Sequence, residues 1–146
     1  MSDTLNGKPP TLFWVIAVVL LLWNLTGLMF YYGQVTMTPE MMAETFSEAE
    51  RAFMEQMPVW ATAAYATAVT AGVIGAVLLL LRKALALPLF IVSFAGVLIQ
   101  DFEAFILSDA IAVWGSSALT LPLVVIVICV FEIWYSRSAK AKGWLT

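Results

Sequence analysis

The sequence predicts an all-α, polytopic membrane protein: a four-transmembrane-helix bundle with an amphipathic outer-side helix between spans one and two. Three observations predict this class. Of the 146 residues, 62% are hydrophobic and only 12% are charged, whereas roughly a quarter of the residues of a soluble domain are charged. The charged residues cluster and leave four long apolar runs between them. The basic residues also concentrate on one side of those runs.

The composition also limits the chemistry of the chain. It contains no histidine and a single cysteine, Cys129, which excludes imidazole ligation of haem or zinc, an internal disulfide and a CxxC redox pair. The sequence shows no nucleophile–base pair, no set of metal ligands and no phosphate-binding loop. We therefore expect no enzymatic activity, no cofactor, no metal site and no nucleic-acid partner.

Each apolar run is long enough to cross the bilayer, because a helix needs about 20 residues to span roughly 30 Å of hydrocarbon. The expected spans are residues 12–32, 59–81, 87–107 and 117–135, within a single membrane domain of residues 1–146. Backbone groups in lipid must be hydrogen-bonded within their own segment, which favours helices. The first run is too long for a signal-peptide core and lacks a small-residue cleavage site, so we expect it to be retained.

The basic residues predict the orientation. Six of the seven lie before span one, between spans two and three, or after span four: Lys8, Arg82, Lys83, Arg137, Lys140 and Lys142. Only Arg51 lies on the other side. The positive-inside rule then places both termini in the cytoplasm. Residues 137–146 are expected to form a short basic cytoplasmic tail that is frayed at the lipid surface.

The loop between spans one and two predicts an amphipathic helix over residues 39–57. Thr38 is suited to cap it, and Pro39 to occupy its first position. Apolar residues from Met42 to Met57 recur at steps of three and four, opposite an acidic stripe. Three interpretations remain open: a helix lying on the membrane surface, a helix packed over the bundle, and a lid over an outward-facing cavity.

Span two carries small residues at every fourth position: Ala64, Ala68, Gly72 and Ala76. Small residues let two helices approach closely in lipid, where no hydrophobic force drives them together. This face therefore predicts a central buried helix or the seam of a dimer. The expected partners are the lipid bilayer and either a second copy of the chain or partner membrane subunits.

A few polar and aromatic residues within the spans are candidates for substrate binding. Span three places Ser93, Gly96, Gln100 and Glu103 on one helical face, with Asp101 about 100° away from Gln100. The substrate-binding hypothesis names Asn24, Gln100, Asp101, Glu103, Trp23 and Tyr65. The alternatives are a structural role for the asparagine and an interfacial position for the two acids. Glu132 is expected at the cytoplasmic end of span four in a structural role, paired with nearby basic residues or at the interface.

Several short motifs carry a resemblance that covers most of the chain: Trp23-Asn24-Leu25-x-Gly27, Tyr31-Tyr32, Thr38-Pro39-Glu40, Pro58-x-Trp60-Ala61, Arg82-Lys83 and Pro88-Leu89-Phe90. With these motifs the chain resembles small four-span bacterial inner-membrane proteins commonly labelled "sugar transporter". The resemblance implies a location in the bacterial inner membrane and a role in solute transport. It implies no particular functional residue.

Two functions follow from the sequence. The first is the transport of a small polar solute, such as a sugar, by an oligomer with span two at its seam and with Glu103 as a candidate for proton coupling. The second is a non-catalytic scaffold or accessory subunit of a membrane complex. A polar cavity on which Asn24, Gln100 and Glu103 converge would favour transport, whereas separate positions would favour the scaffold.

Overall fold

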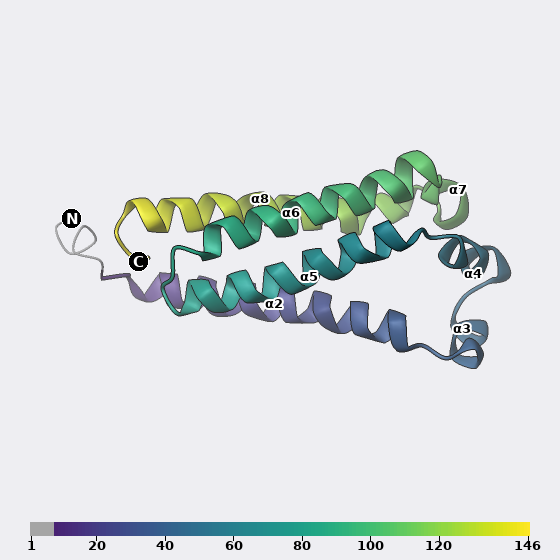
Figure 1. Ribbon diagram of the computed structural model, residues 1–146, viewed down its shortest axis with the longest axis horizontal. Helices are drawn as coiled ribbons and strands as arrows, with labels where there is room; N and C mark the ends of the chain where they lie inside the picture. Colours follow the sequence, from purple (N-terminus) through teal and green to yellow (C-terminus); the bar gives the residue numbers. More distant parts are fainter. Residues whose placement is uncertain (1–7) are drawn as a thin grey trace.

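A computed structural model describes residues 8–146 as an elongated bundle of four long helices (Figure 1). The long helices are α2 (Thr11–Thr36), α5 (Val59–Leu80), α6 (Ala86–Phe102) and α8 (Thr120–Ala141). The start of α2 and the end of α8 lie at one end of the bundle, here called the terminal end. Short helices α3, α4 and α7 lie at the opposite end, the loop end (Figure 1).

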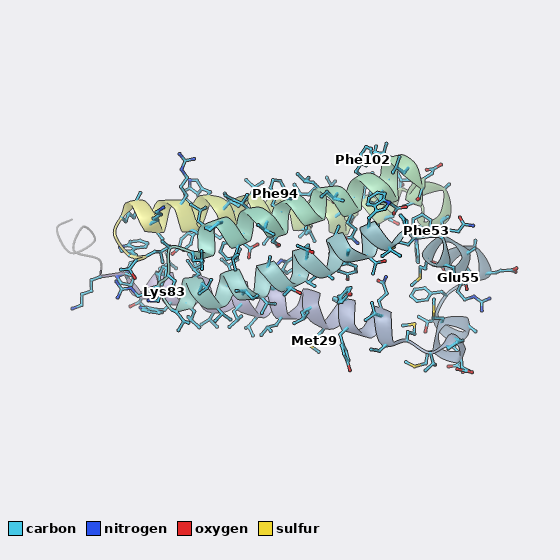
Figure 2. The ribbon with its side chains drawn as sticks, viewed as in Figure 1. Met29, Phe53, Glu55, Lys83, Phe94 and Phe102 are labelled. Atoms are coloured by element: carbon cyan, nitrogen blue, oxygen red, sulfur yellow. The ribbon has the colours of Figure 1, made fainter. Side chains whose placement is uncertain are left out.

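Four segments are long and apolar enough to span a membrane, which confirms the predicted class: Thr11–Thr36, Val59–Leu80, Ala86–Leu107 and Ser116–Ala141. Many of their large apolar side chains lie on the outside of the bundle, including Phe102, which is labelled in Figure 2. Such a surface suits lipid and not water. The labelled charged residues lie at the two ends, Lys83 at the terminal end and Glu55 at the loop end (Figure 2).

Helix α5 is the centre of the packing, since it lies along both α2 and α6, while α6 also packs along α8. Its small residues make these approaches close. A methyl group added at Gly96 of α6 would lie 2.8 Å from the backbone oxygen of Ala64 and 3.1 Å from the Cβ of Ala68. The small-residue face of span two is therefore covered within the chain. The expected dimer seam does not lie there, because α2 and α6 already occupy that face.

The terminal half of the bundle is filled by one apolar core. Its members come from all four long helices and from the end of the chain: Phe13, Ala17, Leu20, Ala76, Leu79, Ala86, Phe90, Ala139, Trp144 and Leu145. Six of these side chains, among them Phe13 and Leu79, have no exposed surface at all. This half of the bundle therefore holds its four helices together by close packing.

The C-terminal residues differ from the frayed tail that the sequence predicts. Helix α8 continues to Ala141, and the chain then folds back under the terminal end. The Ala84 amide donates to the Thr146 carbonyl at 2.9 Å, and the Thr146 amide donates to the Arg82 carbonyl at 2.9 Å. Trp144 and Leu145 are buried. Burial of these two apolar side chains draws the tail onto the bundle in spite of its basic residues.

The predicted outer helix is divided into α3 (Pro39–Thr45) and α4 (Glu48–Glu55). The division follows from a second helix start within the stretch. Ser47 accepts a hydrogen bond from the Glu50 amide at 3.2 Å, and the Glu50 carboxylate accepts one from the Ser47 amide at 2.8 Å. This reciprocal capping box ends the first helix at an extended Phe46 and begins the next.

The third span ends in a π-helical turn, Glu103–Leu107, in which the Ser108 amide donates to the Glu103 carbonyl. Asp109 then adopts a left-handed conformation (φ 50°) ahead of α7 (Ala110–Trp114). A 3₁₀ turn, Ser116–Leu119, leads into α8. The wider π turn changes the direction of the side chains at the loop end of span three.

Candidate functional site

The loop-end half of the bundle contains a partly open cavity of about 580 Å³. Its walls come from α2, α5, α6 and α8, and Phe46 and Met54 of the α3–α4 region line it as well. Asn24 and Ser93, two of its polar residues, lie within about one helical turn of the core residues Leu20 and Phe90. A volume of this size is typical of small-molecule sites.

The cavity exists because one side of the bundle is loosely joined. Whereas α2–α5, α5–α6 and α6–α8 pack closely, the backbones of α2 and α8 scarcely approach each other. Contacts between these two helices include the stacked rings of Phe13 and Tyr135, with centroids 6.2 Å apart, and the polar pair of Asn24 and Glu132. From that pair toward the loop end, the cavity lies between the two helices. It is lined by α2 residues between Trp23 and Gln34 and by α8 residues between Leu121 and Glu132.

The Asn24–Glu132 pair is buried near the middle of the membrane-spanning helices. The Asn24 side-chain amide donates to the Glu132 carboxylate at 2.6 Å and to the Leu20 carbonyl of its own helix at 2.8 Å. Only 2% of the Glu132 surface is exposed. Gly72 of α5 leaves the space for Asn24, because an added Cβ would overlap the Asn24 side-chain oxygen. A small residue of the predicted packing face thus positions a polar group of the cavity.

Helix α6 contributes a polar stripe to the same cavity through Ser93, Gln100 and Asp101. The Ser93 hydroxyl donates to the Ala68 carbonyl at 2.7 Å and so joins α6 to α5. One carboxylate oxygen of Asp101, Oδ2, is buried and has no hydrogen-bond partner among the described residues. An unpaired buried oxygen of this kind is costly unless a ligand or water supplies a donor.

The short helices at the loop end partly cover the cavity. Phe46, at the end of α3, lies edge-on to Trp114 of α7, with ring centroids 5.9 Å apart. Phe53 of α4 contacts the same indole ring at 6.5 Å. These ring contacts hold the α3–α4 segment over the bundle. The structure thereby favours the covering interpretations of this segment over a helix lying flat on the membrane.

The structure brings together five of the six residues of the substrate-binding hypothesis, since Trp23, Asn24, Tyr65, Gln100 and Asp101 all line the cavity. Glu103 does not. It lies at the start of the π turn, where it is 2% exposed and accepts a hydrogen bond from the Ser108 hydroxyl. Its side chain bonds to Ser108 within the π turn and does not line the cavity.

Glu132 is the polar residue that the sequence-based site lacks. The expected position at a helix end was wrong, because α8 continues for nine residues beyond Glu132, to Ala141. A signal for it exists in span four: Pro122, Val125, Cys129 and Glu132 recur at steps of three, four and three, and all four line the cavity. That spacing is typical of one helical face.

The arrangement has the size and the mixed polar and aromatic lining of a small-molecule site. No group of three or more histidine, cysteine, aspartate or glutamate residues within residues 8–146 could hold a metal ion. The chain matches no protein-family model, no curated protein and no solved structure. The resemblance to four-span proteins labelled "sugar transporter" therefore stays a prediction. The fold is that of a polytopic, four-span membrane protein with a cavity between its helices that several polar side chains line.

Proposed function

We propose that the chain transports a small polar solute across a membrane through the cavity in its loop-end half, and that it performs no enzymatic reaction. One observation carries the proposal: Asn24, Gln100, Asp101 and Glu132, from three different helices, meet in one cavity inside the membrane-spanning region. Polar residues within a membrane are costly, and they face a solute pathway more often than lipid.

The two ends of the cavity support a transport cycle. At the loop end it is only partly covered, by the short helices α3 and α4, in which no residue is buried, and at the terminal end it is closed by the apolar core. With the termini in the cytoplasm, as the basic residues predict, the present state opens outward. Passage then requires the terminal core to separate, while α2 and α8, the most loosely joined pair, supply the freedom to move.

A sugar is the solute class that the resemblance suggests. The Gln100 amide and the carboxylates of Asp101 and Glu132 are groups that bond to hydroxyls, and the rings of Trp23 and Tyr65 suit the C–H face of a sugar. The expected location is the inner membrane of a bacterium. A transporting assembly of two or more copies would use a surface other than the covered small-residue face of α5.

Uptake by the purified chain in proteoliposomes tests the proposal. Val125→Trp fills the cavity, whereas Val127→Trp, on the same helix, places the same ring on a side chain that is 66% exposed. We expect uptake of a transported solute from a panel of labelled sugars and other small polar solutes. Val125→Trp should abolish that uptake, and Val127→Trp should retain it. Equal uptake by both variants would remove the cavity from the pathway.

A second function, an accessory subunit of a membrane complex, is favoured by one observation: the loosely joined α2–α8 side could accept a helix of another subunit. The same experiment separates the two functions. A transporter supports uptake as the purified chain alone. An accessory subunit supports none, and its Val125→Trp variant fails to assemble with its complex in native membranes, whereas Val127→Trp assembles normally.

A further inference from the structure

The cavity has acidic groups and no basic group to balance them. Asp101 of α6 and Glu132 of α8 both line it, and none of its described lining residues is a lysine or an arginine. The basic residues of the described chain instead lie at the ends of the bundle or in the loops: Lys8, Arg51, Arg82, Lys83, Arg137, Lys140 and Lys142. The charge of an ionised carboxylate here can therefore be balanced only by something that enters the cavity.

Three hydrogen-bond donors of the cavity are already engaged, whereas one buried acceptor remains without a donor. The side-chain amide of Asn24 donates to Leu20 and Glu132, the Ser93 hydroxyl donates to Ala68, and the Thr26 hydroxyl donates to Leu22. The Asp101 Oδ2 atom, in contrast, is buried and lacks a donor within the described residues. This acceptor calls for a ligand that donates a hydrogen bond. A protonated amine donates one and carries the charge opposite to that of a carboxylate.

The remaining walls are apolar and aromatic. Trp23 and Phe30 of α2 and Tyr65 of α5 present rings to the cavity, next to aliphatic residues such as Val97 and Val125. Tyr65 is held in place by an edge-on contact with Tyr31, whose ring centroid lies 5.0 Å away. Aromatic faces attract cations, most strongly where water is excluded. These walls therefore suit a solute with a positive charge on an apolar body.

We propose that the solute of this cavity is a small organic cation, a protonated amine on an apolar or aromatic body, whose charge lies between Asp101 and Glu132. This inference rests on the proposed function only for the location of the site, and it narrows the substrate class. A neutral lipid chain would leave the Asp101 Oδ2 atom without a hydrogen-bond donor.

A set of three probes that differ only in charge tests the inference. These are 2-phenylethylamine, 2-phenylethanol and phenylacetate, which are cationic, neutral and anionic at neutral pH. Their binding to the full chain in a neutral detergent is measured by equilibrium dialysis. We expect the amine to bind at least about tenfold more tightly than the alcohol, a difference of about 1.4 kcal/mol, and the acid to bind most weakly. Equal affinities for the amine and the alcohol would overturn the inference.

Matched variants assign the charge preference to the cavity. Asp101→Asn and Glu132→Gln should each lower the amine affinity about tenfold and leave the alcohol affinity unchanged. Glu103→Gln is the control, because Glu103 is a buried acid of the same span that does not line the cavity. Its affinities should equal those of the unaltered chain. If Glu132→Gln fails to fold, Asp101→Asn alone decides, because Asp101 Oδ2 makes no hydrogen bond that folding could need.

The outcomes for the inference and for the proposed function are distinct. Charge-selective binding of the amine without uptake of any solute would contradict transport and keep the cation site. Sugar uptake that Val125→Trp abolishes, together with amine binding that Asp101→Asn and Glu132→Gln both leave unchanged, would keep transport and reject the cation. Retention of the full amine affinity by both charge variants rejects the inference in either case.

Discussion

The two halves of the bundle differ in how they fill the space between the same four helices. In the terminal half, Phe13, Leu79 and Phe90 form a core with almost no exposed surface. Trp144 and Leu145, from the end of the chain, pack against that core. In the loop-end half the helices leave a cavity of about 580 Å³. The boundary between the halves is the Asn24–Glu132 hydrogen bond. Packing thus supplies stability in one half and leaves room for a ligand in the other.

The largest expected difference in unfolding free energy comes from removing one phenylalanine ring from each half. Phe90→Ala should lower the free energy of unfolding by about 3 kcal/mol, because the ring fills a closed core that cannot collapse. Phe30→Ala, at a cavity-lining side chain that is 67% exposed, should cost less than about 1 kcal/mol. Denaturant titration in mixed micelles measures both. Equal costs would show that the halves do not differ in packing.

A smaller effect is expected from adding one methyl group at the boundary. Gly72→Ala should cost about 2 kcal/mol, because the new Cβ would overlap Asn24 and press on the Ser93 hydroxyl at 3.2 Å. Gly33→Ala is the control, since no atom lies within 4 Å of its added Cβ. The same titration compares them. A neutral Gly72→Ala would mean that α2 and α5 separate more easily than the close approach suggests.

The boundary hydrogen bond should contribute about 1 kcal/mol, the scale of side-chain hydrogen bonds between membrane helices. A double-mutant cycle of Asn24→Ala and Glu132→Leu measures the coupling between the two residues, because leucine has no acceptor for the Asn24 amide. A parallel cycle of Asn24→Ala with Glu103→Gln should give no coupling, because Glu103 does not contact Asn24. The absence of coupling in the first cycle would place the boundary elsewhere.

The smallest effect concerns the cover of the cavity. Ser47→Ala removes one half of the capping box and should loosen α4 by about 0.5 kcal/mol, without changing the stability of the bundle. Hydrogen exchange at the first amides of α4 should become a few times faster, while amides of α5 keep their rates. An unchanged rate in α4 would show that the contacts of Phe46 and Phe53 with Trp114 hold the cover without the capping box.

The local features of this fold were predictable, whereas those that depend on distant contacts were not. Apolar runs locate the four spans because each helix satisfies its own backbone in lipid. Asn24 and Gln100 were identified because polar residues in such runs are rare. Glu132 was misplaced because its depth depends on where α8 ends, and the packing of Trp144 and Leu145 against the bundle extends order past that point.

The structure differs from the sequence-based prediction at two further places, and the cause of each is local. The periodicity of hydrophobic residues does not reveal either cause. The third span changes to a π turn at Glu103, and the Glu103 side chain bonds to Ser108 of that turn instead of lining the cavity. Ser47 and Glu50 carry the spacing of a capping box within a stretch whose apolar stripe predicts one continuous helix. In both cases a local side-chain hydrogen bond accompanies the change in the backbone path.

The contrast between a hollow and a packed half is tested most directly by the accessibility of introduced cysteines. In a Cys129→Ala background, Gln100→Cys lies in the cavity and Ala76→Cys lies in the terminal core. A small, water-soluble thiol reagent is applied to membranes that contain each variant. The account predicts rapid labelling at position 100 and none at position 76 until the protein is unfolded. Equal labelling at the two positions, or none at position 100, would contradict it.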